Sequence, residues 1–342
     1  MRMKSVDILN GGEVLAEAVL TEEKAVLIPK GTAIKADYVP LIQSLGIETL
    51  MIEDPYEDLE EPNTIINPSR LEAYVDQVQK LMESHIYHAR KSLREFEIIA
   101  NEMVKEVDEM PGNVVIDMNE RTANLYEHTV MVTLLSVAVA KKLHLDRKRR
   151  YHIALGCLLH DIGIRYITAK YENQDWTNAD PIEIFEFKKH TILGYSAIEQ
   201  ESWVPDIARK MILSHHEKMD GSGFPMHQKN RETECKIIQA CDSFDCYISG
   251  MECRRMSVQE ALQKIASEAG ILYEPKIVDH LVAMVAKYPV GTTVKTNDET
   301  EGVVVSQTLD PENPIIMVIN AENERHRRNL MLEENISILQ IV

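Results

Sequence analysis

Residues 153–161 read Ile-Ala-Leu-Gly-Cys-Leu-Leu-His-Asp, so a histidine and an aspartate directly follow seven apolar or small residues. Such a run is typical of a buried helix, and we expect the side chains of His160 and Asp161 to emerge at its buried end. A buried charge is costly unless it is paired or bound to a metal ion. The stretch therefore predicts a helical core that carries a metal-binding pair at one end.

Further metal-binding residue types lie on both sides of this stretch. They are Glu127-His128, Lys189-His190, His215-His216-Glu217 and Asp242. The region around them has many apolar spacings of three and four residues, for example Val130, Leu134 and Val137, which predict helices. Imidazole nitrogens together with carboxylate oxygens suit Fe, Mn or Zn better than Mg. We expect an all-helical region to gather these side chains around divalent metal.

The rest of the chain predicts a mainly α protein with two small additions. Residues 1–62 form a small α/β module that ends in the acidic, proline-containing stretch from Glu53 to Asn63. Residues 63–113 hold the end of this linker and a long connecting helix, and residues 114–288 form the helical metal-binding domain. Residues 289–342 contain short runs rich in Val and Ile, which predict a β-rich C-terminal appendage.

A helical pattern runs from Ser69, which forms a capping box with Glu72, to Met110 before a Pro-Gly pair. One long helix, or two in line, is predicted. Its apolar positions are Leu71, Val75, Val78, Met82, Ile86, Ala89, Leu93, Phe96, Ala100, Met103 and Val107. This seam favours packing onto the same domain, and the alternative is a homodimer through the 69–110 helix.

The composition indicates which binding partners and which cellular compartment to expect. The formal net charge of −18 repels a phosphate backbone, so no DNA or RNA surface is expected. The longest apolar run, Thr129 to Ala140, has 12 residues, short of the roughly 20 that a bilayer requires, so no membrane segment is expected. Five cysteines without CxxC spacing, and no apolar segment near Met1, predict a cytoplasmic protein.

The order of the motifs resembles the HD-GYP family, bacterial cyclic di-GMP phosphodiesterases of the HD superfamily. The matching elements are His128, His160-Asp161-Ile-Gly163, His190 with Gly194, His215-His-Glu-Lys-Met-Asp-Gly-Ser-Gly-Phe-Pro225 and Cys241-Asp242-Ser-Phe-Asp245. The resemblance covers about residues 114–287, with Phe224 where the family motif has tyrosine. It implies an HD-type bundle of helices around two, sometimes three, metal ions.

The resemblance also assigns roles to residues. The implied metal ligands are His128, His160, Asp161, His190, His215, His216 and Asp242, with Asp161 as the bridging carboxylate and with His160 and Asp161 as catalytic residues. The implied cofactors are two divalent ions, most readily Fe or Mn. The implied reaction is in-line attack of a metal-activated hydroxide on cyclic di-GMP, giving linear pGpG and then GMP. The implied substrate contacts are Lys188, Gly221, Gly223 and Arg254.

Three positions depart from the family pattern. Ile164 stands where the HDIGK motif has its lysine, and Arg165 follows one residue later, which predicts reduced activity. Asn124 stands where three-metal members carry a glutamate, which favours two metals. The RPYR stretch of the family aligns with Met251-Glu-Cys-Arg254 and keeps only its last arginine. Two alternatives therefore stay open: a catalytically weak cyclic di-GMP receptor or interaction regulator, and a hydrolase of another phosphate ester.

Overall fold

The computed structural model describes residues 2–6, 9, 11–20, 26–44, 47, 49–53, 59–88, 93–174, 176, 179–229, 231–319 and 324–342. The chain forms two compact units. One contains residues 62–289 and 307–312, and the other contains residues 1–61, 290–306 and 313–342. Residues 63–113 therefore pack with the helical unit. Ala89 of the predicted seam and residues 54–58 of the predicted linker lie outside the described residues.

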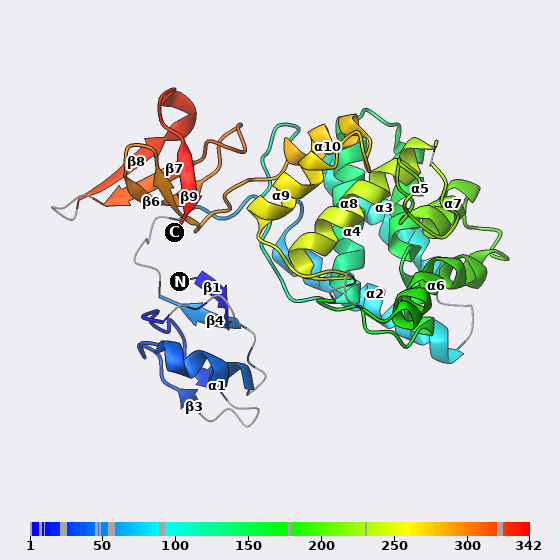
Figure 1. The fold of residues 1–342 in the computed structure, drawn as a ribbon, viewed down its shortest axis with the longest axis horizontal. Helices are drawn as coiled ribbons and strands as arrows, with labels where there is room; N and C mark the ends of the chain where they lie inside the picture. Colours follow the sequence, from blue (N-terminus) through cyan, green and yellow to red (C-terminus); the bar gives the residue numbers. More distant parts are fainter. Residues whose placement is uncertain are drawn as a thin grey trace. The chain divides into compact units, whose positions relative to one another are not determined.

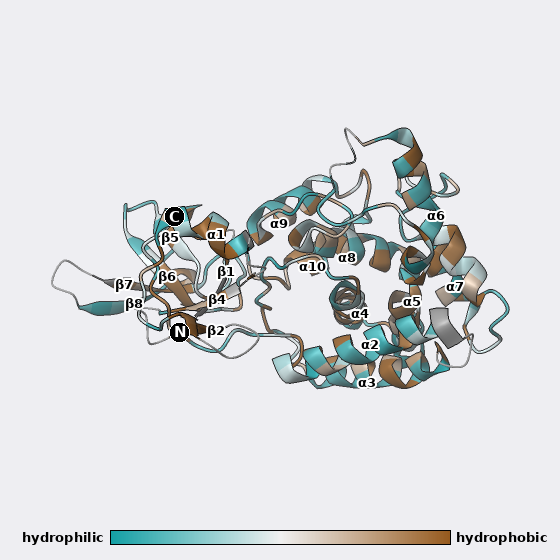
Figure 2. Cartoon of the chain, turned by 90° about the horizontal axis from the view of Figure 1, so that it is seen from below, coloured by the Kyte–Doolittle hydropathy of each residue, from teal (hydrophilic) through white to brown (hydrophobic). Residues whose placement is uncertain are grey.

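Helix α4 (Leu125–Lys142) is the centre of the larger unit (Figure 1). The side chain of Asn124 begins it by accepting hydrogen bonds from the backbone N–H groups of Tyr126 and Glu127. Thirteen of its eighteen residues are buried, as expected for a helix covered on all sides. It contacts α2 (Pro68–His88), α3 (Phe96–Glu109), α5 (Arg147–Leu159), α8 (Thr233–Ser249) and α10 (Pro275–Val282). Figure 2 shows α4 nearly end-on among its neighbours. The helix predicted from the spacing of Val130, Leu134 and Val137 is confirmed.

The remaining helices of this unit surround α4. Their bounds are α5 (Arg147–Leu159), α6 (Pro181–Ile198), α7 (Asp206–Ser214), α8 (Thr233–Ser249), α9 (Val258–Ser267) and α10 (Pro275–Val282), with a 3-10 helix η4 (Ile162–Tyr166) after α5. Helix α5 packs against α4 and α7, and α6 packs against η4 and α7. The ends of several helices thereby meet inside the bundle. None of the described helices combines the length and the apolar character needed to cross a bilayer.

The region predicted as a connecting helix forms two helices that are not in line. It consists of α2 (Pro68–His88) and α3 (Phe96–Glu109), with a short 3-10 turn between them. The guanidinium of Arg70, near the start of α2, donates to Glu106, near the end of α3, at 2.9 Å, so the helices run antiparallel and not in line. The N-terminal cap also differs: Asn67 Oδ1 accepts from Ser69 N at 2.9 Å, because Pro68 takes the first helical position.

The apolar seam of these two helices faces the chain's own core. Val78, Met82, Phe96, Met103 and Val107 are fully buried in the same hydrophobic cluster as α4. This face therefore packs onto its own domain, the first of the two readings that the sequence allows. A homodimer through the 69–110 helix would need these already buried side chains, and the structure does not support it.

The smaller unit holds a short mixed segment and a β-sheet. In the N-terminal part, β1 (Arg2–Ser5) pairs antiparallel with β4 (Thr49–Ile52), β2 (Val19–Leu20) pairs with β3 (Val26–Ile28), and α1 (Val39–Ser44) packs on the core of Leu15, Ile34 and Ile42. The C-terminal part is a five-stranded antiparallel sheet in the order β8-β7-β6-β5-β9. Its strands are β5 (Thr293–Thr296), β6 (Glu301–Ser306), β7 (Ile315–Ile319), β8 (Arg325–Asn329) and β9 (Ile338–Ile341). The predicted fold class, a helical bundle with a small α/β module and a β-rich appendage, is confirmed.

Candidate metal centre

Five helices bring all seven predicted metal ligands together. His128 lies in the first turn of α4, His160 caps the end of α5, Asp161 precedes η4, His190 lies in α6, His215 and His216 follow α7, and Asp242 lies in α8. All seven are buried, and the most exposed of them, His216, has an exposed fraction of 8%. Residues up to 114 positions apart in the sequence, His128 and Asp242, thus come within 3.2 Å of each other.

A hydrogen bond to a backbone carbonyl orients each of three histidine rings. Nδ1 of His160 contacts the carbonyl oxygen of Cys157 at 2.6 Å, and Nδ1 of His190 contacts that of Phe187 at 2.7 Å. His215 makes the same contact with Ile212 at 2.8 Å. A carbonyl oxygen can only accept, so Nδ1 carries the proton in these rings. In the neutral ring, Nε2 is then left with a free electron pair, which is the form that binds metal.

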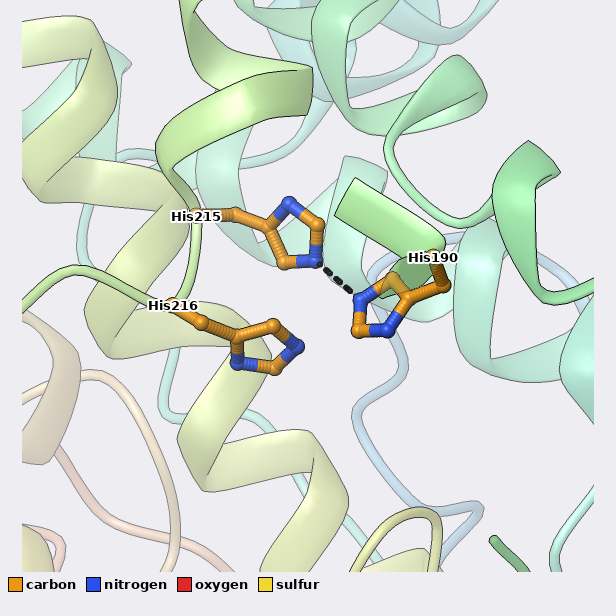
Figure 3. A group of neighbouring side chains, drawn as sticks. All are labelled: His190, His215 and His216. Carbon is orange, nitrogen blue, oxygen red and sulfur yellow. Dashed lines mark hydrogen bonds between the residues drawn. The ribbon is translucent and has the colours of Figure 1, made fainter. Parts of the chain in front are cut away.

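The Nε2 atoms meet in two pairs. Nε2 of His128 lies 3.3 Å from Nε2 of His160, and Nε2 of His190 lies 3.1 Å from Nε2 of His215. Figure 3 shows the rings of His190, His215 and His216 converging on a common point. Both Nε2 atoms of the His190–His215 pair are unprotonated in the neutral rings, and two such nitrogens at this distance repel each other unless a cation lies beside them. This pair is therefore arranged as metal ligands are, and the His128–His160 pair has a similar spacing.

Asp161 lies between the two pairs. Its Oδ2 is 3.3 Å from Nε2 of His160 and 3.6 Å from Nε2 of His128. Its Oδ1 is 3.4 Å from Nε2 of His215 and 3.6 Å from Nε2 of His190. Neither oxygen has a hydrogen-bond partner within the described part of the chain, although both are buried. Since a buried carboxylate without partners is costly, these oxygens fit cation binding.

Asp242 completes the His128 side of the centre. Its Oδ1 lies 3.2 Å from Nε2 of His128 and 3.6 Å from Nε2 of His160, while Oδ2 has no hydrogen-bond partner among the described residues. Several triads of these side chains, among them His128-His160-Asp161 and His190-His215-His216, have ligand atoms within 4.8 Å of one another. The nitrogen and oxygen donors fit a divalent transition metal.

The pKa values of the cluster differ between its two sides. Burial lowers the pKa of His128, but hydrogen bonds to Asp242 and Asp245 outweigh it and raise that pKa to about 9. Burial prevails at His216 and lowers its pKa to about 4. Burial raises the pKa of Asp161, but His160 beside it prevails and holds the pKa well below its usual range. His128 thus binds a proton more tightly than an ordinary histidine, at the place where a metal ion would lie.

Asp245 and Arg121 lie behind His128; the sequence motif includes Asp245 but assigns neither residue a role. Oδ2 of Asp245 lies 2.7 Å from Nδ1 of His128, and the Arg121 guanidinium forms an ion pair with the same carboxylate. Two acidic side chains of α8, Asp242 and Asp245, therefore face His128 from positions three residues apart. That spacing on one helix face was the available signal.

Glu217 belongs to the loop after the centre and does not join the ligands. Its Oε1 accepts from Met226 N at 2.6 Å and its Oε2 accepts from Gln228 N at 2.8 Å. Gly223 lies so close to the chain that a Cβ there would meet the carbonyl oxygen of His216 at 2.3 Å. Gly221 has a φ of +85°, which favours glycine. These contacts fold the loop back onto the His216 backbone.

A pocket of about 410 Å³ opens beside His216. Its lining residues include Lys188 and Gly223 of the predicted substrate contacts, together with Trp176, Phe187, Lys218 and Phe224. Lys218, which sequence reasoning missed, is held by Tyr273 OH at 2.7 Å and Ser243 Oγ at 3.1 Å. Gly221 and the exposed Arg254 are not among the lining residues. Two lysines and three aromatic rings make this pocket suited to an anionic, ring-containing ligand.

The positions that depart from the family pattern have structural roles. Ile164 has an exposed fraction of 3% and lies in the hydrophobic core. Helix α5 ends at Leu159 and a 3-10 helix follows, so Arg165 is turned by about 120° from Ile164 instead of the 100° of an α-helix. The Asn124 side chain accepts two backbone hydrogen bonds as the cap of α4.

Comparison with known proteins agrees with this geometry. The sequence matches the HD domain family over residues 113–277. A cyclic di-GMP phosphodiesterase of Thermotoga maritima is 28% identical over 204 residues, covering 57% of this chain and 55% of that protein. A cyclic di-GMP phosphodiesterase of Pseudomonas aeruginosa is 28% identical over 185 residues, covering 53% and 44%. The chain thus spans about half the length of these curated relatives.

A solved structure shares the fold. An HDG"Y"P protein from Bdellovibrio bacteriovorus superposes with a TM-score of 0.50 at 18% identity, covering 82% of this chain and 98% of that one. This likeness concerns the fold. Over residues 113–277 this chain is therefore similar to the HD domain family, and it is also similar to bacterial proteins named cyclic di-GMP phosphodiesterases.

Proposed function

We propose that this protein is a metal-dependent phosphodiesterase that hydrolyses cyclic di-GMP to linear pGpG. The observation that carries the proposal is Asp161, whose two buried oxygens lack hydrogen-bond partners among the described residues and each face a pair of histidine Nε2 atoms. A carboxylate placed in this way can bridge two cations. The names of the curated relatives support the choice of substrate.

Two sets of side chains would hold the ions, with Fe or Mn as the preferred metals. The first set is His128, His160, Asp242 and Oδ2 of Asp161, and the second is His190, His215, His216 and Oδ1 of Asp161. When bound, the ions supply positive charge that lowers the pKa of water and stabilises negative charge on phosphorus. His160 and Asp161 act as catalytic residues by holding this charge in place.

The pocket beside His216 would bind the substrate. Lys188 and Lys218 place two ammonium groups at a pocket of a protein whose formal net charge is −18, so phosphate is attracted locally. The rings of Trp176 and Phe187 stack with centroids 4.7 Å apart and provide an aromatic wall for a base. Hydrolysis adds one water molecule across a P–O bond, which opens the cyclic dinucleotide and releases a 3′ hydroxyl group.

The test is incubation of Mn- or Fe-loaded protein with cyclic di-GMP, with separation of the linear product by chromatography. We expect pGpG from the wild type and none from His160→Ala or Asp161→Ala. A matched control is Asp117→Asn. Asp117 is also buried, but it lies outside the metal centre and accepts a hydrogen bond from the backbone N–H of Asn63. Absence of linear product from metal-loaded wild type would remove the proposal.

A second candidate function is a cyclic di-GMP receptor that turns over little substrate. The burial of Ile164 in the core favours it, because no cation stands at the position of the motif lysine. Calorimetry separates the two: binding of cyclic di-GMP without product indicates a receptor, and rapid turnover excludes it. A panel of other phosphate esters and cyclic dinucleotides addresses the remaining alternative, a hydrolase of a different substrate.

A further inference from the structure

Glu252 lies against the metal centre, although it is outside the predicted ligand set. It follows α8 in the segment that aligns with the RPYR stretch of the family, at the position of the family's proline. Its exposed fraction is 7%, and its Oε2 lies 3.2 Å from Nε2 of His216. The carboxylate therefore belongs to this chain's own version of the centre.

The contact between Glu252 and His216 is close, but it is not a hydrogen bond. Nε2 of His216 and Oε1 of Glu252 are both buried, and neither has a hydrogen-bond partner in the described ranges. Glu252 also has an oxygen within 4.8 Å of ligand atoms of Asp161 and His190, and within 4.8 Å of those of His216 and Asp242. Each of these two groups, which share Glu252, has the spacing of ligands around one cation.

The backbone holds Glu252 in an unfavourable conformation. Its φ is +59°, in the left-handed region that a residue with a Cβ atom rarely adopts. The Trp176 indole N–H donates to the carbonyl oxygen of Glu252, and the Asn173 N–H donates to that of Gly250 at 2.6 Å. Strain that neighbouring contacts maintain is common at ligand sites. Here it directs the carboxylate inward.

The charge of the cluster requires compensation. Three buried carboxylates, Asp161, Asp242 and Glu252, converge on the same group of histidines. Removing carboxylates from water is strongly unfavourable unless a cation or hydrogen-bond donors replace the water. Among the described residues, no lysine or arginine pairs with Glu252: its Oε2 lies near Nε2 of His216, at 3.2 Å, and near the weakly polar thiol of Cys246, at 3.9 Å.

We infer that Glu252 is a further ligand of the metal ion held by His190, His215 and His216. The inference rests on the metal centre of the proposed function but does not require hydrolysis. With Asp161, this ion would have two carboxylates and three imidazoles. An added carboxylate strengthens binding of a divalent ion and leaves fewer positions for water.

The test is removal of bound Mn²⁺ with graded concentrations of chelator, followed by elemental analysis of the protein. In Glu252→Gln the side chain keeps its size but loses its charge, so one of the two ions should leave at a chelator strength lower by about tenfold or more. The matched control is Glu234→Gln. Glu234 has an exposed fraction of 8%, pairs with Arg149 at 2.7 Å, and lies outside the candidate metal groups of the described residues.

Replacing the bound metal ion with Co²⁺ distinguishes metal ligation by Glu252 from a purely structural role of this residue. If Glu252 binds the ion, its loss changes the coordination number and therefore the visible absorption of bound Co²⁺ in Glu252→Gln, whereas Glu234→Gln keeps the wild-type spectrum. Circular dichroism of the metal-free variants checks folding, and in Glu252→Ala added formate should restore part of the affinity. If Glu252→Gln binds metal as tightly as the wild type and keeps the wild-type Co²⁺ spectrum, the inference about Glu252 is overturned, but the proposed function is not. A wild type that binds no metal would overturn the proposed function as well.

Discussion

Asp161 is the residue whose charge the centre most depends on. Each of its oxygens faces two Nε2 atoms, so replacement by asparagine removes the charge and one of the two acceptor oxygens without changing the size. We expect Asp161→Asn to retain neither ion at stoichiometric level and to lose hydrolysis. Elemental analysis after desalting measures this, with Asp117→Asn as the control. Two ions retained by Asp161→Asn would show that the carboxylate does not bridge them.

Ile164 bears on whether the motif lysine could be restored. Its side chain is 3% exposed and lies among apolar residues, so a lysine there would place an ammonium group in the core. We expect Ile164→Lys to lower the free energy of unfolding by about 3 to 5 kcal/mol, as an uncompensated buried charge does, without raising activity. Urea denaturation measures the loss, and Ile164→Leu, which keeps the volume, is the control. A stable and more active lysine variant would contradict the buried orientation.

His128 gives the centre a dependence on pH. Its pKa of about 9 lies above the ordinary value of 6.5, so its proton stabilises the metal-free fold fully below pH 6.5 and this contribution is lost as pH rises through 9. A metal ion must displace that proton. We therefore expect metal affinity to rise between neutral pH and pH 9, by about tenfold per pH unit for each displaced proton. Calorimetry in buffers of different ionisation enthalpy counts the protons released at pH 7, and a count of zero would refute the expectation.

At the scale of elements, the sequence predicts the helices that contain long apolar runs and the residues at which these helices end. It does not predict the course of the loops. Helices α4 and α5 follow from continuous apolar segments, and His160 and Asp161 mark the end of α5 because the apolar run stops there. The antiparallel course of α2 and α3 was missed because the apolar period of the sequence continues from one helix into the other. Glu252 and Lys218 were missed because each lies outside the helices, where no period marks the buried side.

The contact between η4 and α6 sets the distance between Asp161 and His190. A Cβ on Gly163 would lie 1.8 Å from the carbonyl oxygen of His190 and 2.7 Å from the N atom of Gly194, both of them backbone atoms that cannot rotate away. Gly163→Ala must therefore push α6 from η4. We expect a loss of about 3 kcal/mol in unfolding free energy and weaker metal binding. The control is Gly112→Ala, where a Cβ would meet nothing within 4 Å. Unchanged stability and metal content in Gly163→Ala would contradict this close approach.

At the scale of the whole molecule, metal should stabilise one unit and leave the other unchanged. The ligands come from α4, α6 and α8, from the end of α5 and from the residues after α7, so bound ions hold together helices of the larger unit only. The two units have separate hydrophobic clusters. Both tryptophans of the sequence, Trp176 and Trp203, lie in the larger unit, so their fluorescence reports on its unfolding alone.

We therefore expect chelation to lower the Tm of the fluorescence transition. An ion present at a thousand times its Kd contributes about 4 kcal/mol to the folded state, and its removal loses that amount. The smaller unit holds the five-stranded sheet, so any separate transition that far-ultraviolet circular dichroism detects there should keep its Tm. Asp161→Asn is the control, since without the bridging carboxylate its Tm should respond little to chelator. A wild-type fluorescence transition that is insensitive to metal would mean that the buried histidines and carboxylates are satisfied without a cation.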